Sequence, residues 1–595
     1  MKTSSAEKRR DCPPASGPGA KIRASKSAPR RAAALFLVHA LIAVHIAHWL
    51  STGSSLSPLE PSEAMEFVKH DLVNAGLIFF GLAILSTLVL GRWFCGWACH
   101  LVALQDSCSW LLRKVGIRPK PLRSRLLAFV PAAAAVYMFL YPLLHRWWFG
   151  RGFTTPKIAL TKQDFWETFP PWTVALVTFA VCGFVTIYFL GAKGFCTYAC
   201  PYGAIFGLVD RLAVGRIRVT DACEGCGHCT ATCSSNVIVH EEVRQHGMVV
   251  DPGCMKCLDC VSVCPKNALY FGFGRPSFWT RAASKLRSRA SFSLGEELLA
   301  AAAFLAAFFA FRGLYGVIPF LLALALAGIL ACCSVALARA TQRRELSFCG
   351  RALKRGGRWT RAGAVFAALM LAIAVLAVHS ALVQYHSARS ARAFDDAHEL
   401  QEAFLVDPRR ALEGERRIQV ENALQSARFV QRWGLLPSPQ NDLQLAWFCL
   451  LVGSPGEFER RLASAVANDP ELVSARFDLG LFLEARGRAE EACAQYEAGL
   501  AQVPSAGGYD RLAQLQWRIG KREDALATYE RAAHAHPENT DVHFNLGVAQ
   551  AELGRFARAA DAFRRVLELD PERVDAAENL AGVLAAQESE VGAPR

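Results

Sequence analysis

Long apolar blocks alternate with shorter polar connections through about the first 380 residues of the chain. Because a bilayer core needs about 20 mostly apolar residues in a helix, each block predicts a membrane-spanning helix. The fifth block is the weakest, since Arg312 and Gly313 interrupt it and Pro319 follows, so half of a re-entrant hairpin is its alternative. The seven predicted spans are roughly residues 32–50, 72–90, 126–144, 172–190, 298–311, 317–337 and 362–383.

Basic residues are concentrated in alternate connections. Segments 1–31, 91–125 and 339–361 hold 24 Lys and Arg in all, whereas 51–71, 145–171 and 312–316 hold six. Such a bias orients a membrane protein with its basic connections in the cytoplasm, so most of the net charge of +14 reflects topology. We therefore predict a disordered basic N-terminal tail over 1–31 and no nucleic-acid partner, since no RNA- or DNA-binding motif accompanies the charge.

The C-terminal part of the chain repeats with a period of 33 or 34 residues. Small residues recur at Ala446, Gly480, Ala513, Gly547 and Ala581. This period predicts an α-solenoid that resembles tetratricopeptide repeats over 437–590, preceded by a helical connector at 385–436. Stacked helix pairs expose a concave surface, so a protein partner is the expected ligand, with simple structural spacing as the alternative. Seven spans would place the repeats in the periplasm.

Twelve of the 20 cysteines fall in short spacing patterns. Two runs of C-x2-C-x2-C-x3-C lie within residues 191–290, and this spacing is typical of bacterial ferredoxins that hold two [4Fe-4S] clusters. The fourth cysteine of each run ligates the other cluster, which predicts Cys223, Cys226, Cys229 and Cys264 on cluster 1, and Cys254, Cys257, Cys260 and Cys233 on cluster 2. Zinc is the weaker alternative, because four-Cys zinc modules usually pair two C-x2-C knuckles.

Two C-x3-C pairs follow the second and fourth predicted spans, at Cys95 with Cys99 and at Cys196 with Cys200. Residues four apart share one face of a helix, so each pair can present two sulfurs to one point. The pairs suit a third iron–sulfur cluster, a redox-active dithiol near a quinone, or purely structural cysteines. About 12 irons per chain would indicate three cubanes, and about eight would indicate two.

Several histidines lie in or near the predicted spans. The set comprises His39, His45, His48, His70, His145 and His379. Ionisable groups within a membrane are functional candidates, so a quinol site or haem ligation is one interpretation of these residues. Interfacial polar residues without a ligand are the other.

The order Phe-Cys-Gly-Trp-x-Cys, Phe-Cys-x-x-x-Cys-Pro-Tyr-Gly and two ferredoxin runs, interleaved with spans, resembles the membrane polyferredoxins. That family includes the NapH-type quinol dehydrogenase subunit of periplasmic nitrate reduction. The resemblance covers roughly residues 30–275, and His100 departs from it, because the family has Pro after both C-x3-C pairs. It implies the quinone pool and a redox protein as electron partners of a chain embedded in the lipid of a bacterial inner membrane, with the ferredoxin insert cytoplasmic.

The predicted fold is an all-α multi-pass membrane protein with a small α+β two-cluster ferredoxin insert and a C-terminal α-solenoid. Its membrane helices divide into a four-helix domain over 32–190 and about three further helices over 291–384. The predicted function is iron–sulfur electron transfer between the quinone pool and a redox partner, and a quinol-linked oxidoreductase subunit is its enzymatic form. The alternatives are an assembly factor for a respiratory metalloenzyme, with the repeats docking its client, and a scaffold with structural clusters. The sequence leaves the direction of electron flow open.

Overall fold

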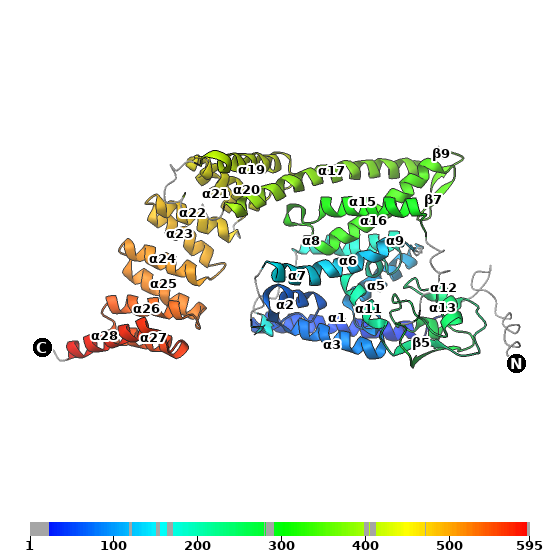
Figure 1. Cartoon of the computed structure of the whole chain (residues 1–595), viewed down its shortest axis with the longest axis horizontal. Coiled ribbons are helices and arrows are strands. Elements are labelled where there is room, and N and C mark those ends of the chain that lie inside the picture. Colours follow the sequence, from blue (N-terminus) through cyan, green and yellow to red (C-terminus); the bar gives the residue numbers. More distant parts are fainter. Residues whose placement is uncertain are drawn as a thin grey trace. The chain divides into compact units, whose positions relative to one another are not determined.

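The computed structural model describes residues 23–117, 119, 122–149, 155–162, 171–278, 280, 291–397, 404, 412–469 and 472–591. The chain forms two compact units, Met1–Ala381 and Leu382–Arg595. Figure 1 follows the chain from the apolar helices of the first unit, in blue to green, to the helical repeats of the second, in yellow to red.

Each of the seven predicted apolar blocks is helical over most of its length. In the described part of the chain, six helices are long and apolar enough to cross a membrane, and a seventh, α3 (Ala75–Leu90), is shorter. The six are α1 (Ser27–Thr52), Leu127–Trp148, Trp172–Leu190, α15 (Leu294–Phe311), α16 (Phe320–Gln342) and α17 (Arg361–Asp396). Leu127–Trp148 contains α6 (Val130–Ala135), a π-helical turn at Val136–Leu140 and α7 (Tyr141–Trp148), and Trp172–Leu190 contains α8 (Trp172–Phe179), a π-helical turn at Ala180–Val185 and α9 (Thr186–Leu190).

Many apolar side chains of these helices face outward. On α1, Phe36 is 76% exposed and Val44 is 65% exposed, although both are apolar. A helix that is apolar on all sides is stable only inside a large protein core or in lipid. The fifth predicted block forms a complete 18-residue helix that packs along α16, where half of a re-entrant hairpin was the alternative.

Two connections meet at one end of this helical unit. Strand β1 (Ser55–Leu56) pairs antiparallel with β4 (Thr161–Lys162), and β2 (Leu72–Val73) pairs parallel with β3 (Lys157–Ile158). The short helix α2 (Ala64–His70) lies in the first connection, and Asp71 after it forms an ion pair of 2.5 Å with Arg146 at the end of α7. The connections 51–71 and 145–171 therefore contact each other at one end of the helices.

The cysteine-rich segments lie at the other end of the helices (Figure 1). Short helices α4 (Trp93–Trp97) and α10 (Gly194–Tyr198) precede α5 (His100–Lys114) and α11 (Pro201–Asp210). The insert contains β5 (Gly215–Val219), α12 (His228–Thr232), α13 (Val239–His246), α14 (Asp259–Ser262) and β6 (Leu269–Phe273). Strands β5 and β6 pair antiparallel over a small core that includes the buried Ile217, Val243 and Val249.

A three-stranded antiparallel sheet joins α16 to α17 and has no counterpart in the sequence prediction. It consists of β7 (Leu346–Phe348), β8 (Arg351–Arg355) and β9 (Arg358–Trp359). Cys349 and Gly350 have positive φ angles in the first turn, and Gly356 and Gly357 have them in the second. Two consecutive residues with positive φ are typical of tight hairpin turns.

The second unit is an array of paired helices. The helices are α19 (Gly414–Trp433), α20 (Pro439–Leu451), α21 (Pro455–Asn468), α22 (Val473–Ala485), α23 (Ala489–Leu500), α24 (Ala506–Arg518), α25 (Arg522–Ala535), α26 (Thr540–Glu552), α27 (Phe556–Leu569) and α28 (Val574–Val591). The periodic small residues have a physical cause, because a Cβ at Gly480 would lie 2.5 Å from the Tyr496 ring, and one at Gly547 would lie 2.8 Å from the Phe563 ring. Only a small residue allows each pair of helices to pack this closely.

Candidate iron–sulfur centres

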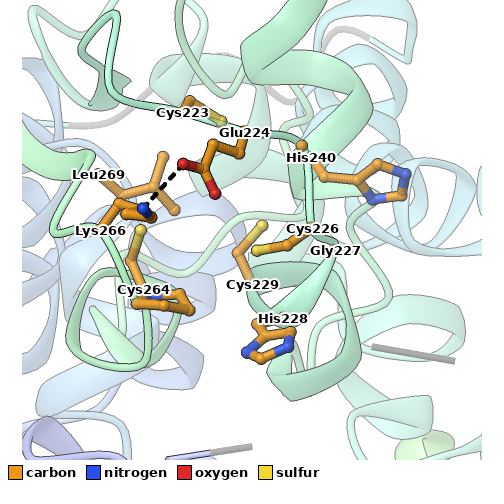
Figure 2. Close-up of a pocket in the computed structure, with 12 residues that line it drawn as sticks. Cys223, Glu224, Cys226, Gly227, His228, Cys229, His240, Cys264, Lys266 and Leu269 are labelled. Carbon is orange, nitrogen blue, oxygen red and sulfur yellow. Dashed lines mark ion pairs between the residues drawn. The ribbon is translucent and has the colours of Figure 1, made fainter. Parts of the chain in front are cut away.

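Four of the predicted cluster ligands surround one pocket. Cys223, Cys226, Cys229 and Cys264 all line it, and Figure 2 shows them around a common space. Cys264 comes from the second cysteine run, so the structure brings together the set that the ferredoxin spacing predicts. The backbone N–H of Ala268 donates a hydrogen bond of 3.3 Å to the Cys264 sulfur. Their ligation of a cluster stays a prediction.

The two cysteine runs have the same backbone conformation, 31 residues apart. Gly225 and Gly227 have φ angles of 75° and 81°, and the equivalent Lys256 and Leu258 have φ angles of 51° and 63°. A left-handed conformation strains a residue with a side chain, and such strain is typical of functional sites. Left-handed residues in a turn can direct successive N–H groups into one concavity, and such a concavity suits an anionic group such as an iron–sulfur cluster.

The second predicted set is gathered in the same way and is more deeply buried. Cys233 lies within electrostatic reach of Cys254, Cys257 and Cys260, so the fourth cysteine of the first run again crosses to the other set. Burial raises the pKa of the Cys257 thiol to about 12, partly opposed by the nearby Arg31 guanidinium. In the first set, burial raises the pKa of Cys229 to about 12.

A cubane cluster and a zinc ion make different demands on these thiols. Iron binds the thiolate form, so cluster binding to these buried thiols releases their protons. Among the described residues, no group of three or more His, Cys, Asp or Glu side chains is arranged to hold a metal ion. One zinc ion needs its sulfurs about 2.3 Å from a single point, whereas each cysteine of a cubane binds a different iron and the sulfurs lie farther apart.

The two C-x3-C pairs also have equivalent backbones. Ala98 and Cys99 both donate backbone hydrogen bonds to the Phe94 carbonyl, at 2.9 and 3.1 Å. Ala199 and Cys200 donate to the Phe195 carbonyl in the same way, at 2.9 and 3.0 Å. His100 thus starts α5 as Pro201 starts α11, and the departure from the family pattern at His100 leaves the turn unchanged.

The four sulfurs of these pairs, which we call the cysteine quartet (Cys95, Cys99, Cys196 and Cys200), converge at one place. Cys200 lies within electrostatic reach of the other three, and burial raises the pKa of Cys99 to about 12. Two buried side chains donate hydrogen bonds to the sulfurs, Arg92 Nε to Cys95 at 3.2 Å and Gln105 Nε2 to Cys196 at 2.9 Å. Donors to sulfur favour the thiolate, so the surroundings suit metal ligation as well as a redox dithiol.

The quartet packs directly against the loop of the second cluster set. A Cβ at Gly96 would lie 2.3 Å from the Met255 carbonyl oxygen and 3.6 Å from the Cα of Cys257. Trp97 Nε1 donates a hydrogen bond of 3.0 Å to the Lys256 carbonyl. The backbones of the two candidate centres are therefore in van der Waals contact.

A buried carboxylate joins the same elements. The Asp210 side chain is fully buried, and its Oδ1 accepts from Lys256 Nζ and from the Arg92 backbone N–H, both at 2.8 Å. Arg216 Nη1 lies 3.6 Å from Asp210 Oδ2. A buried ion pair is retained only where its partners are held in good geometry, so this network fixes the cluster loop against α4 and α11.

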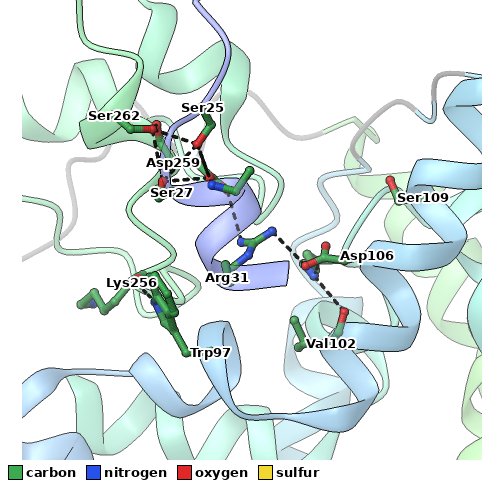
Figure 3. Close-up of polar contacts among 12 residues, drawn as sticks. Ser25, Ser27, Arg31, Trp97, Val102, Asp106, Ser109, Lys256, Asp259 and Ser262 are labelled. Carbon is green, nitrogen blue, oxygen red and sulfur yellow. Dashed lines mark hydrogen bonds and ion pairs between the residues drawn. The ribbon is translucent and has the colours of Figure 1, made fainter. Parts of the chain in front are cut away.

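The first turn of α1 also contacts the insert. Ser25 donates to Asp259 at 2.6 Å, and Arg31 lies 3.2 Å from Asp259 and 2.9 Å from Asp106 (Figure 3). Lys193 completes the network with a 2.5 Å contact to Asp106. The predicted disordered tail over 1–31 is therefore too long, because these contacts order its end and α1 begins at Ser27, while residues 1–22 lie outside the described residues.

A cavity of about 630 Å³ adjoins the quartet. Val38, Leu41 and Ile42 of α1 contribute to its apolar wall, and the four cysteines of the quartet line it as well. Of the histidines that the sequence singled out, His45 lines the cavity, whereas His39 bonds the Leu35 carbonyl of its own helix. Glu60, His100 and Tyr202 also line it, and the sequence analysis did not single out Glu60 or Tyr202.

Comparisons with known proteins agree with these sites. A 4Fe-4S binding domain model matches residues 74–118 and 172–220, a 4Fe-4S dicluster domain model matches 222–269, and a tetratricopeptide repeat model matches 459–507, 511–574 and 551–594. The two matches of the 4Fe-4S binding domain model contain the cysteine quartet. The match of the dicluster domain model contains both ferredoxin runs.

Relatives of the first unit are ferredoxin-type proteins. The methylamine utilization ferredoxin-type protein MauN of Methylorubrum extorquens is 28% identical over 37% of this chain and 78% of its own length. The ferredoxin-type protein NapH of Haemophilus influenzae is 26% identical over 37% of this chain and 73% of its own, and the putative electron transport protein YccM of Escherichia coli is 27% identical over 36% and 63%. Among solved structures, MamA covers 27% of the chain at 18% identity with a TM-score of 0.23.

The chain is thus similar to NapH- and MauN-type ferredoxin proteins and has tetratricopeptide repeats at its C-terminus, which confirms the resemblance inferred from the motifs.

Proposed function

We propose that the protein is a membrane-bound iron–sulfur relay that transfers electrons between the quinone pool and a redox protein. One observation supports this most strongly. The cysteine quartet lines a largely apolar cavity, and Gly96 beside Cys95 packs against the loop of the second cluster set. An apolar cavity beside a redox centre suits a quinone ring, because ligand sites are mostly apolar with a few polar groups that fix orientation.

The centres would form one line from the cavity to the surface. Electrons would pass between the quartet, the buried set of Cys254, Cys257, Cys260 and Cys233, and the first set. Three cysteines of the first set are half-buried, against two of the second, so the first set would be the one nearer to solvent and to a redox partner. Thiolate-ligated clusters exchange one electron at a time, with potentials set by hydrogen bonds and burial.

We further propose that the quartet holds a third [4Fe-4S] cluster. Four converging cysteines match the usual ligand count, and the 4Fe-4S binding model covers both pairs. Arg92 and Gln105, which donate to the sulfurs, would lower the charge density of such a cluster and raise its potential.

The proposed location is a bacterial inner membrane with the ferredoxin insert in the cytoplasm and the repeats in the periplasm. Alternation of the basic connections supports this orientation. The repeats would then dock a periplasmic protein partner, since stacked repeats offer an extended concave surface.

Mixing the anaerobic, detergent-solubilised protein with a reduced menaquinone analogue tests the relay. We expect electron paramagnetic resonance signals of reduced clusters to appear on mixing, and a Cys99→Ser variant to lose them while a Cys182→Ser control keeps them. Clusters that respond to dithionite but not to quinol in the unmodified protein would contradict the relay and would favour a soluble electron donor.

A further inference from the structure

We propose that Glu60 exchanges protons with the quinol in the cavity, so that protons and electrons leave the site at opposite ends of the helical unit. This inference rests on the proposed quinol function and deepens it. Oxidation of a quinol to a quinone releases two electrons and two protons. The cysteine quartet offers a route for the electrons, so the protons need an acceptor that also lines the cavity.

The chain after α1 folds back into the helical unit and brings Glu60 to the cavity. The His45 ring, in the middle of α1, lies 3.0 Å from the Leu56 carbonyl oxygen, so segment 56–62 returns alongside the helix that precedes it. The Ser57 N–H donates to the Leu160 carbonyl at 2.9 Å, and this fixes the segment at its other side. Leu56, Leu59 and Glu60 from this segment all line the cavity.

Glu60 lines the cavity, and part of its side chain is exposed to solvent. Its side chain is 30% exposed, whereas that of the neighbouring Glu63 is 4% exposed and accepts from Asn74 Nδ2 at 3.2 Å. Ser62 donates a 2.5 Å hydrogen bond to Glu60 Oε1, which fixes the orientation of the carboxylate. A carboxylate in contact with both compartments can take a proton from the quinol and pass it to water.

Other charged and titratable groups surround Glu60, and His100 lines the same cavity. His100 Nε2 lies 3.9 Å from Glu60 Oε2, and Tyr202 and Glu63 lie within electrostatic reach. Lys162 contacts Glu63 at 3.9 Å. Arg92 bonds to Cys95 at the quartet and stays protonated at any physiological pH, so it cannot accept a proton.

The two exits would lie at opposite ends of the helical unit, so protons and electrons would be separated. Glu60 belongs to the connection that pairs with segment 155–162, while the insert lies at the other end of the same helices (Figure 1). Electrons would leave through the quartet toward the insert, and protons would leave through Glu60 toward the opposite end. Quinol oxidation would then move charge across the membrane in each turnover.

Proteoliposomes that contain the full chain and a menaquinol analogue test the proposal. External ferricyanide, which does not cross the bilayer, would accept electrons from outward-facing inserts, with two ferricyanides reduced per quinol. We expect an entrapped pH dye to report internal acidification of about two protons per quinol, after subtraction of protein-free liposomes. Protons that appear in the outer medium instead would overturn the proposal, whereas no ferricyanide reduction at all would contradict the relay itself.

Variants separate proton exchange from a structural role of Glu60. Glu60→Gln should slow quinol oxidation at least tenfold with iron content and cluster spectra unchanged, and Glu60→Asp should retain internal acidification. Glu66→Gln is the matched control, because Glu66 lies on α2 outside the cavity lining. A Glu60→Gln variant that oxidises quinol and acidifies the interior at the unmodified rate would overturn the proposal.

Discussion

At Gly96, the lack of a side chain allows the first C-x3-C turn to touch the loop of the second cluster set. A Cβ there would lie 2.3 Å from the Met255 carbonyl oxygen, which forces the two backbones apart. Electron transfer slows steeply with distance, so we expect Gly96→Ala to slow reduction of the insert clusters by quinol at least tenfold. Freeze-quench electron paramagnetic resonance measures this rate. Gly81→Ala is the control, because a Cβ at Gly81 meets nothing within 4 Å, and equal rates in both variants would contradict the packing argument.

A second residue-scale effect concerns Glu242 in the insert. Burial raises the pKa of this carboxyl to about 7, although the Val250 and Asp251 N–H groups each donate to it at 3.0 Å. The pKa is higher in the folded state than in the unfolded chain, so the folded insert loses stability as pH rises through about 5 to 7. The glutamine in Glu242→Gln stays neutral at all these pH values. The melting temperature of the variant minus that of the unmodified protein should therefore be larger at about pH 8 than at about pH 6.

The bleaching of cluster absorption on heating measures this difference. Glu241→Gln on the same helix is the control. This variant also loses one carboxylate, but it keeps the buried Glu242, so its melting temperature should depend on pH as that of the unmodified protein does. A melting difference between Glu242→Gln and the unmodified protein that is the same at both pH values would refute the assignment.

The ligand sets of the cysteines can be predicted from residue type and spacing. The side chains that surround these cysteines cannot be predicted in this way. A fixed spacing within one loop predicts the ligand sets, because the loop itself brings the sulfurs together. Glu60 contacts His100, and Asp210 contacts Lys256 and the Arg92 backbone N–H, across separations of tens to more than a hundred residues, so the sequence alone does not place these carboxylates beside the cysteine motifs. Their roles depend on tertiary packing.

At the scale of elements, the two C-x3-C turns have equivalent backbones and together supply the four cysteines of the quartet. The iron content of cysteine variants tests whether they hold a third cluster. If the quartet holds a cubane, Cys99→Ser should lower the iron content from about 12 to about eight per chain, and Cys264→Ser should cause a similar loss from the insert. If the quartet is a redox dithiol or structural, Cys99→Ser should leave the iron content unchanged. Iron analysis of anaerobically purified protein decides between them, with Cys493→Ser in the repeats as the control.

Periodic elements are predictable and local hairpins are much less so. The repeats follow from Gly480 and Gly547 at a fixed spacing, because close packing against Tyr496 and Phe563 selects small residues. The sheet β7–β9 consists of short strands in a basic connection, and its alternation is too brief to separate it from a loop. Only the Gly-Gly pair at Gly356 gives a local signal of a turn there.

At the scale of the whole molecule, the side of the membrane on which the repeats lie depends on α3 and α17. Although α3 has only 16 residues, the segment before it pairs with 155–162 and the segment after it contacts the insert, so α3 runs from one end of the helical unit to the other. Helix α17 has 36 residues and a length of about 54 Å, which exceeds a bilayer core of about 30 Å. If all seven helices cross the bilayer, we expect everything after α17 to lie outside the cytoplasm.

Reporter fusions test this topology directly. Alkaline phosphatase, which is active only outside the cytoplasm, should be active when fused after residue 397 and inactive when fused after residue 343, between α16 and β7. A fluorescent protein that matures in the cytoplasm should give the reverse pattern at the same two positions. Inactive phosphatase together with fluorescence after residue 397 would mean six crossings. The repeats would then meet a cytoplasmic partner on the same side as the ferredoxin insert, and the partner search would have to move to that compartment.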